Sequence, residues 1–358
     1  MKVQEIYSFL DEIAPFKYSD GFDNTGLLVG RGEDEVCGIM LALDITNDVA
    51  DEALYKNCNL IISHHPVIFS PLRAISPGHP AARLLRHSLN AIGFHTNFDM
   101  ADGGISDILA DILMVKNTGQ VIEPIHKFPY KQLSVYAPTD KAEAVFAAMS
   151  EAGAGTFGTY DGCAFFGRGE GRFTPREGAK PAVGKVNAAQ KVPETKIEML
   201  VKPSLLNCVV QKMLAAHPYE VPAYEISDNF SRFEEVGYGR ICEIEETSAS
   251  ELAARVKMAL GCPSVKMSAG SARIKKIGIS GGAGGNIWAL AAGKGADAYI
   301  TGEVKHSVWQ EVHDANFTLI DAGHFYTEQC AFARLKEKIQ KRFNVHVEVS
   351  EQHYVVEA

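Results

Sequence analysis

One pattern constrains the fold more than any other feature of the sequence: a strand–helix–strand–helix–strand order occurs twice. The first copy contains three apolar runs of strand length. Between the first two runs, Val49, Ala53 and Leu54 recur at helical spacing and predict a helix. These runs are GIMLALD (38–44), NLIIS (59–63) and AIGFHTNFD (91–99), the last expected to end at Asp99. The second copy has its runs at 275–281, 296–302 and 317–325. Strands that alternate with helices predict a duplicated α/β domain with a mostly parallel sheet.

The pattern changes between the two copies, near residues 128–231. The runs KQLSVYAP (131–138) and KIEMLVKP (196–203) each open a strand–helix–strand unit, and a double split β-α-β order is typical of ferredoxin-like folds. The joining stretch 167–185 is rich in Gly, Pro and Arg and is expected to be a long flexible loop. We therefore expect a discontinuous α/β domain of residues 1–127 and 232–358, interrupted by an α+β domain of residues 128–231.

Charge and cysteine usage exclude several classes of protein. Acidic side chains outnumber basic ones by 44 to 35, which gives a formal charge of −9 and disfavours binding to nucleic acid or anionic lipid. No apolar run approaches the ~20 residues that span a bilayer, and residues 1–10 lack the apolar stretch of a signal peptide. The seven cysteines are widely spaced and form no C-x-x-C, as is typical of free thiols. The sequence predicts a cytoplasmic protein without a membrane partner.

A pair of histidines is the strongest local signal for chemistry. His64 and His65 follow a predicted buried strand, and ligands in open α/β sheets bind beyond the carboxyl ends of the strands. Pro66 favours a break in the strand, which allows both imidazoles to reach one site. Neutral imidazole is a common metal ligand, although two hydrogen-bonded loop histidines are the simpler interpretation of this pair taken alone.

Further candidates lie at other predicted strand ends. His324 and Glu328 are four residues apart and share a face if the chain becomes helical after Gly323. Asp99 ends the third predicted strand. Taken alone, His324 and Glu328 are better explained by a hydrogen bond on a helix surface. Asp99 taken alone is often only a turn residue or a helix cap. Together with the histidine pair they place three imidazoles and two carboxylates at one rim, a set that can hold two divalent ions.

The remaining candidates are weaker. Asp44 and Glu303 also follow strands and are candidates for a catalytic role as general base, or for orienting the ligands. Turn and capping roles are the alternative for both. His95 precedes Asp99 by four residues and can face the core instead. The turn 281–285 is either an anion site or simply a tight turn.

Several segments together resemble one known family. They are FDNTGLLVG (22–30), LIISHHPVIF (60–69), HTNFDMADGGISD (95–107) and DAGHFYTEQ (321–329). The chain resembles the Nif-three-like family, also called the GTP cyclohydrolase 1 type 2 family. Within residues 128–231, the stretches EAGAG, GEGRFTP and AHPYE resemble the PII- or CutA-like insertion of its longer bacterial members.

The resemblance implies an assembly and a metal site. It implies a homohexamer, built as a trimer of dimers, with two divalent cations per subunit. Mixed imidazole and carboxylate ligands leave the metal open among Zn, Fe, Mn, Ni and Co. The implied ligands are His64, His65, Asp99, His324 and Glu328.

The family name implies hydrolysis at C8 of the guanine ring of GTP, with release of formate towards dihydroneopterin triphosphate. A two-metal site suits this reaction because it lowers the pKa of a water and polarises the substrate. We therefore expect a metal-dependent hydrolase of a nucleotide or another phosphorylated small molecule. The alternative is a non-enzymatic scaffold or metabolite sensor that uses the PII-like insertion. A ring that binds nucleic acid is disfavoured by the negative charge.

Overall fold

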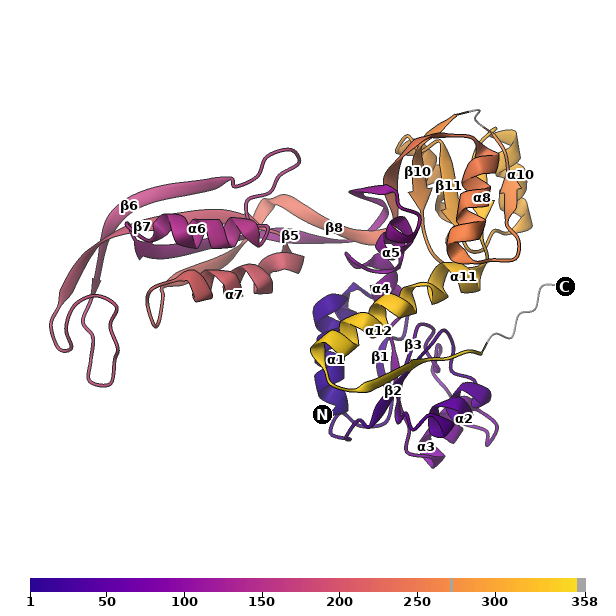
Figure 1. The fold of residues 1–358 in the computed structure, drawn as a ribbon, viewed down its shortest axis with the longest axis horizontal. Helices are drawn as coiled ribbons and strands as arrows, with labels where there is room; N and C mark the ends of the chain where they lie inside the picture. Colours follow the sequence, from indigo (N-terminus) through magenta and orange to yellow (C-terminus); the bar gives the residue numbers. More distant parts are fainter. Residues whose placement is uncertain (271–272, 353–358) are drawn as a thin grey trace. The chain divides into compact units, whose positions relative to one another are not determined.

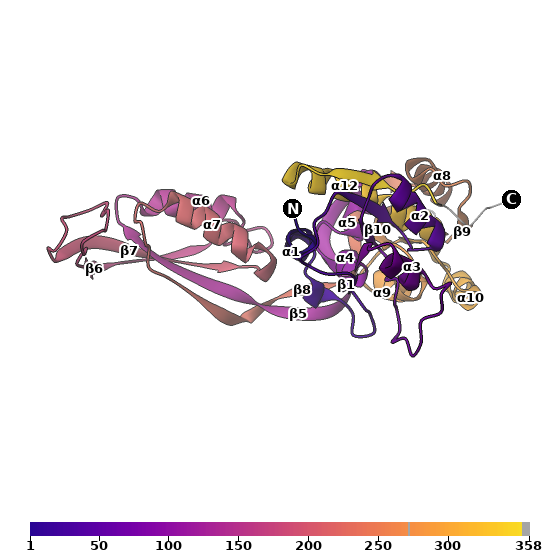
Figure 2. The ribbon, with the colours of Figure 1, turned by 90° about the horizontal axis from the view of Figure 1, so that it is seen from below.

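A computed structural model describes residues 1–270 and 273–352 of the chain (Figures 1 and 2). The chain divides into two compact units. The outer unit consists of Met1–His126 and Val236–Ala358, and the inserted unit of Lys127–Glu235. Two long strands, β5 (Lys116–Pro138) and β8 (Tyr224–Thr247), contribute residues to both units. Within the described residues no helix is long and apolar enough to cross a membrane.

The first sheet of the outer unit has the strand order β1-β4-β3-β2-β13. Its central strands β2, β3 and β4 are parallel, β13 is parallel to β2, and β1 is antiparallel to β4. Every residue of the central three strands is buried, as expected for parallel strands covered on both faces. The bounds are β1 (Gly26–Val29), β2 (Gly38–Ala42), β3 (Leu60–Ser63), β4 (Asn90–Gly93) and β13 (His346–Val349).

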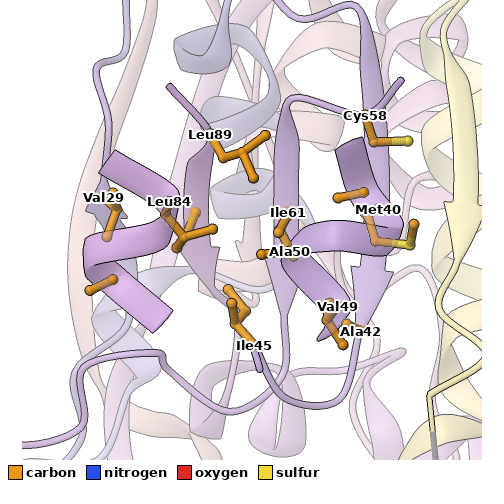
Figure 3. Close-up of a cluster of buried hydrophobic side chains, with 13 residues drawn as sticks. Val29, Met40, Ala42, Ile45, Val49, Ala50, Cys58, Ile61, Leu84 and Leu89 are labelled. Carbon is orange, nitrogen blue, oxygen red and sulfur yellow. The ribbon is translucent and has the colours of Figure 1, made fainter. Parts of the chain in front are cut away.

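Helices α2 (Asn47–Tyr55) and α3 (Pro80–Arg86) connect these strands and cover one face of the sheet (Figure 3). Met40 and Ile61 of the sheet belong to one buried apolar cluster with Val49 of α2 and Leu84 of α3. The side chain of Thr46 accepts a hydrogen bond from the Val49 backbone N–H and caps the N-terminus of α2.

The second half of the outer unit repeats this plan. Strands β10 (Ile274–Ile279), β11 (Ala298–Thr301) and β12 (Thr318–Asp321) are parallel, and α9 (Trp288–Gly293) and α10 (His306–Asp314) connect them. β8 and β9 (Lys266–Ser268) flank them as antiparallel neighbours. The two copies therefore lie in two separate mixed sheets. The expectation of a single sheet rim was wrong, because each parallel set is completed by its own flanking strands, β1 and β13 in the first sheet and β8 and β9 in the second.

The inserted unit has the order β5, α6 (Ala142–Glu151), β6 (Ala164–Phe173), β7 (Gln190–Val201), α7 (Leu206–Ala216) and β8. Its strands lie in the order β6-β7-β5-β8, which is the double split β-α-β arrangement. Leu133, Ile197, Val145 and Val209 are part of its own apolar core.

Two sequence expectations about local structure were wrong. Part of the predicted loop 167–185 is strand, because β6 pairs with β7 along its whole length. The Glu194 carboxylate packs against Gly171 in this pair and would have to move if residue 171 carried a Cβ. The predicted strand 91–99 ends at Gly93, and Asp99 lies on a short helix, α4 (Thr96–Met100).

The remaining elements are α-helices and short 3₁₀ helices (η) that complete the two units. They are α1 (Val3–Ile13), η1 (Phe16–Tyr18), α5 (Ile105–Ile112), η2 (Pro203–Leu205), α8 (Ala249–Leu260), η3 (Gly284–Ile287), α11 (His324–Gln329) and α12 (Ala331–Arg342).

Candidate metal centre

The structure brings together the five residues that the sequence nominated as metal ligands. His64 and His65 follow β3, His324 and Glu328 lie on α11, and Asp99 lies on α4. The helix after Gly323 confirms that His324 and Glu328 share a helical face. The measured separations are His64 Nε2 to Asp99 Oδ1 3.6 Å, His64 Nε2 to Glu328 Oε1 3.5 Å, His65 Nε2 to Glu328 Oε2 3.3 Å and His324 Nε2 to Glu328 Oε2 3.1 Å.

Glu328 is common to two sets of possible ligand atoms. One set is His65, His324 and Glu328, and the other is His64, Asp99 and Glu328; within each set the ligand atoms lie within 4.8 Å of one another. A carboxylate with two oxygens can serve both sets at once.

A fourth histidine belongs to the same cluster. His95 forms a further set with His64 and His65. From the sequence, His95 could face either the core or this site. Ser63 pairs with Gly93 in the parallel ladder of β3 and β4, so two residues further on His65 and His95 are lateral neighbours.

Each of the four imidazoles is held through its Nδ1 atom. The acceptors are oxygens, so Nδ1–H donates and Nε2 is left for the centre of the cluster, as is usual for metal-ligating histidines. The pairs are His64 with the Phe94 carbonyl (3.1 Å), His65 with Asp44 (2.9 Å), His95 with Asp23 (2.9 Å) and His324 with Glu303 (2.9 Å). Asp44 and Glu303 therefore contact two of the histidines directly.

Two buried polar atoms at the centre have no hydrogen-bond partner. They are His64 Nε2 and Glu328 Oε2. Burying polar atoms without partners is costly, so native proteins rarely leave them unsatisfied. An imidazole nitrogen and a carboxylate oxygen are both ligands of divalent cations. The donor set therefore fits a metal ion.

The pKa values of the clustered side chains show that the buried Glu328 carboxylate needs positive charge beside it. Burial opposes the charging of His65, but the hydrogen bond to Asp44 and the negative charge of the nearby Glu328 carboxylate raise its pKa to about 10. Burial likewise opposes the charging of His324, and Glu328 and Glu303 raise its pKa to about 9. Burial raises the pKa of Asp99, whereas the neighbouring histidines hold the pKa of Glu328 well below its usual range against burial. Without a cation, protons on the histidines supply the charge that Glu328 needs.

The glycine-rich turn 281–285 lets Glu328 reach the cluster. Gly282 has φ +59°, and a Cβ there would collide with Glu328 Oε1. Thr327 is fully buried, and its hydroxyl makes two hydrogen bonds. It accepts one from the Gly282 backbone N–H at 3.1 Å and donates one to the His324 carbonyl at 3.0 Å. The turn therefore packs against a carboxylate, which favours the tight-turn interpretation over an anion site.

A buried arginine fixes the helix that carries Asp99. Arg240 is 1% exposed and donates to the carbonyls of Met100 (3.0 Å) and Ala101 (3.1 Å) at the end of α4. It also forms an ion pair with Asp107 at 2.9 Å. The sequence analysis did not identify Arg240, because nothing local to it indicates a partner 140 residues away.

The cluster opens into a cavity of about 590 Å³ in the outer unit. Five of the clustered side chains line it: His65, His95, Asp99, His324 and Glu328. Neither Asp44 nor Glu303 is among its lining residues. A ligand in this cavity would therefore face the cluster, while Asp44 and Glu303 lie behind the histidines.

Comparisons with known proteins agree with this fold and site. The model of the family Duf34/NIF3 (NGG1p interacting factor 3) matches residues 1–354. The chain belongs to the Duf34/NIF3 family. This confirms the resemblance drawn from the sequence motifs.

Relatives that match over most of their length occur in bacteria. The chain is 36% identical over 359 residues to the GTP cyclohydrolase 1 type 2 homolog of Bacillus subtilis (strain 168), covering 97% of this chain and 96% of that protein. A homolog of the same name from Halalkalibacterium halodurans is 34% identical, with 94% and 92% covered. Among solved structures, a Bacillus cereus protein related to NIF3 matches with TM-score 0.77 and 32% identity, covering 99% of this chain and 98% of that one.

Proposed function

We propose that the cluster binds two divalent cations and that this Duf34/NIF3 chain is a metal-dependent hydrolase of a small molecule. The observation that carries the proposal is the position of Glu328, which belongs to two ligand sets and has a buried oxygen without a partner. One cation would be held by His65, His324 and Glu328, and the other by His64, Asp99 and Glu328. His95 is a further candidate ligand. The metal is one of Zn, Fe, Mn, Ni and Co.

Cations held there would supply Lewis acidity, which polarises a substrate and lowers the pKa of a water. The protein's own residues orient the ligands. Asp44 and Glu303 accept the Nδ1 protons of His65 and His324, and neither lines the cavity. We therefore assign both to positioning the imidazoles rather than to the role of general base.

The family name supplies a specific reaction to test. The relatives are named GTP cyclohydrolase 1 type 2 homolog, and that reaction is hydrolysis of GTP at C8 with release of formate. We also propose, from the family resemblance, a cytoplasmic homohexamer built as a trimer of dimers.

A second candidate function is metabolite sensing by a PII- or CutA-like inserted unit, with the cations as structural groups. It is supported by a cavity of about 310 Å³ within that unit, lined in part by the aromatic rings of Tyr136, Phe173 and Tyr219. A mostly apolar cavity with a few polar groups is typical of small-molecule sites.

The test is elemental analysis of the purified chain, followed on the same sample by incubation with GTP and identification of formate. We expect about two cations per chain. His65→Ala should lower the metal content, whereas His313→Ala, which removes an exposed imidazole on α10, should not. Two cations without turnover of any substrate would favour the sensor. No bound cation, even after reconstitution, would contradict the proposal.

A further inference from the structure

The cavity beside the cluster has an unusual charge for a site that would hold a nucleotide. Among the described residues that line it there is no Lys or Arg. Its four carboxylates are Asp20, Asp99, Glu123 and Glu328. Proteins usually hold phosphate chains with arginine, lysine or backbone N–H groups of a helix N-terminus. The one glycine-rich turn at this cavity packs against Glu328 instead.

The cavity does offer hydrogen-bond acceptors. Glu123 of β5 lines it, and its carboxylate makes no hydrogen bond or ion pair with any described residue. The side-chain amide of Asn286 lines it as well and is equally free among the described residues. Asp20 accepts a hydrogen bond from the Tyr238 hydroxyl at 3.3 Å through one carboxylate oxygen, which leaves the other oxygen as a possible acceptor for a ligand. These groups suit a ligand that donates N–H bonds.

One wall of the cavity is apolar and exposed. Phe22, Ile125 and Leu290 all line it, and they are 61%, 36% and 46% exposed. They come from three separate segments: the loop before β1, strand β5 and helix α9. Apolar side chains that converge on a cavity while exposed to solvent mark a ligand surface. A planar ring can pack against this wall.

We propose that the substrate is a nitrogen heterocycle with amino and ring N–H donors, a nucleobase or nucleoside without a phosphate chain. This inference rests on the proposed function, since it assigns the substrate class of the same cavity. The ring packs on Phe22, Ile125 and Leu290, and its N–H groups donate to Glu123 and to the carbonyl of Asn286. A phosphate chain could meet the proposed cations only at the cluster; beyond the cluster it would bring negative charge towards Asp20 and Glu123, with no Lys or Arg of the described lining to neutralise it.

The test compares guanosine with GTP, a pair that differs only in the phosphate chain. Affinities are measured by isothermal titration calorimetry on the full chain after cation loading and desalting, with metal content determined on each sample. We expect guanosine to bind at least as tightly as GTP. Glu123→Gln should weaken guanosine binding by roughly tenfold or more, the worth of a hydrogen bond to a charged group. Glu123 is outside the cluster, so metal content should not change.

Two further variants sharpen the comparison. Glu311→Gln, on the exposed side of α10, is the matched control and should leave guanosine affinity unchanged. Glu123→Lys should shift the preference towards GTP. The inference is overturned if GTP binds tenfold or more tightly than guanosine to the unmodified chain. It is equally overturned if guanosine fails to bind at millimolar concentration or binds Glu123→Gln as tightly as the unmodified chain.

The outcomes separate this inference from the proposed function. A sample with two cations that prefers GTP keeps the metal-dependent hydrolase and removes the substrate class. A sample without cations contradicts the metal site, while guanosine binding that is lost in Glu123→Gln still supports the substrate class.

Discussion

The Nε2 atoms of His65 and His324 lie 3.3 Å apart, although 259 residues separate the two histidines in the chain. Each ring donates its Nδ1 proton to a carboxylate, Asp44 in one case and Glu303 in the other. Neutral imidazoles would therefore direct two lone pairs at each other. A proton or a metal cation must lie between them, and the raised pKa values of both histidines reflect the proton.

Asp44→Asn should weaken cation binding without removing any ligand. The carboxylate fixes the ring of His65 through a 2.9 Å hydrogen bond, and loss of such a partner typically costs roughly 10- to 100-fold in metal affinity. Competition with a chromophoric chelator measures the change. Asp314→Asn at the exposed end of α10 is the control. Equal affinities of the two variants would show that Asp44 does not orient His65.

The cation-free protein should lose stability as the pH rises from about 7 to 10. His65 and His324 have pKa values of about 10 and 9, above the ordinary value of 6.5, so the folded state binds more protons than the unfolded state in this range. Their contribution is complete below pH 6.5 and is lost as the pH passes through the folded-state values. Urea denaturation in the presence of a chelator measures the free energy of unfolding, and a flat profile would contradict the assignment.

Cation binding should reverse this dependence on pH. The ligands must be neutral imidazoles, so cations displace the histidine protons, and affinity should rise with pH. Calorimetric titrations in two buffers of different ionisation enthalpy should reveal proton release. Uptake of protons, or no transfer, would contradict the protonated cluster.

Arg240→Met should destabilise the chain by about 3–5 kcal/mol, the usual cost of breaking a buried ion pair. The substitution leaves Asp107 and the carbonyls of Met100 and Ala101 without their donor. Because these carbonyls end the helix that carries Asp99, metal content should fall as well. Urea denaturation and elemental analysis measure the two effects. Arg334→Met on α12, an exposed arginine, should change stability by no more than about 0.5 kcal/mol.

Gly282→Ala should lower metal content. The new Cβ would displace Glu328, and the φ of +59° is unfavourable for any residue with a side chain. Gly293→Ala is the matched control, because nothing lies within 4 Å of its Cβ position. Normal metal content in the Gly282 variant would show that Glu328 can shift without loss of the site.

The sequence was sufficient to nominate the ligands because they follow a readable rule. His64 and His65 follow one predicted buried strand and His324 lies at the end of another, and the carboxyl ends of parallel strands are where such folds place their sites. The spacing of His324 and Glu328 could be interpreted from helical geometry alone. Local periodicity was also sufficient for the repeated strand–helix order.

The supporting residues could not be predicted in this way. The carboxylate of Asp23 accepts hydrogen bonds from His95 Nδ1 and the Thr96 backbone N–H, across more than 70 residues, and so caps the helix that carries Asp99. A strand interpretation of 91–99 was natural because the segment begins with the apolar run 91–94, whereas the cap of the helix is supplied from elsewhere. The separation of the two copies into two sheets likewise depends on pairings with β1, β8, β9 and β13, which are distant in sequence.

The long separation between His65 and His324 has a consequence for biosynthesis. Three of the five proposed ligands, His64, His65 and Asp99, emerge early from the ribosome, whereas His324 and Glu328 lie near the end of the chain. A nascent chain therefore cannot assemble the complete site. Cations held at the proposed site would load only after translation and would close one very long loop of polypeptide. A chain truncated before His324 would then lose the stabilisation that cation binding provides.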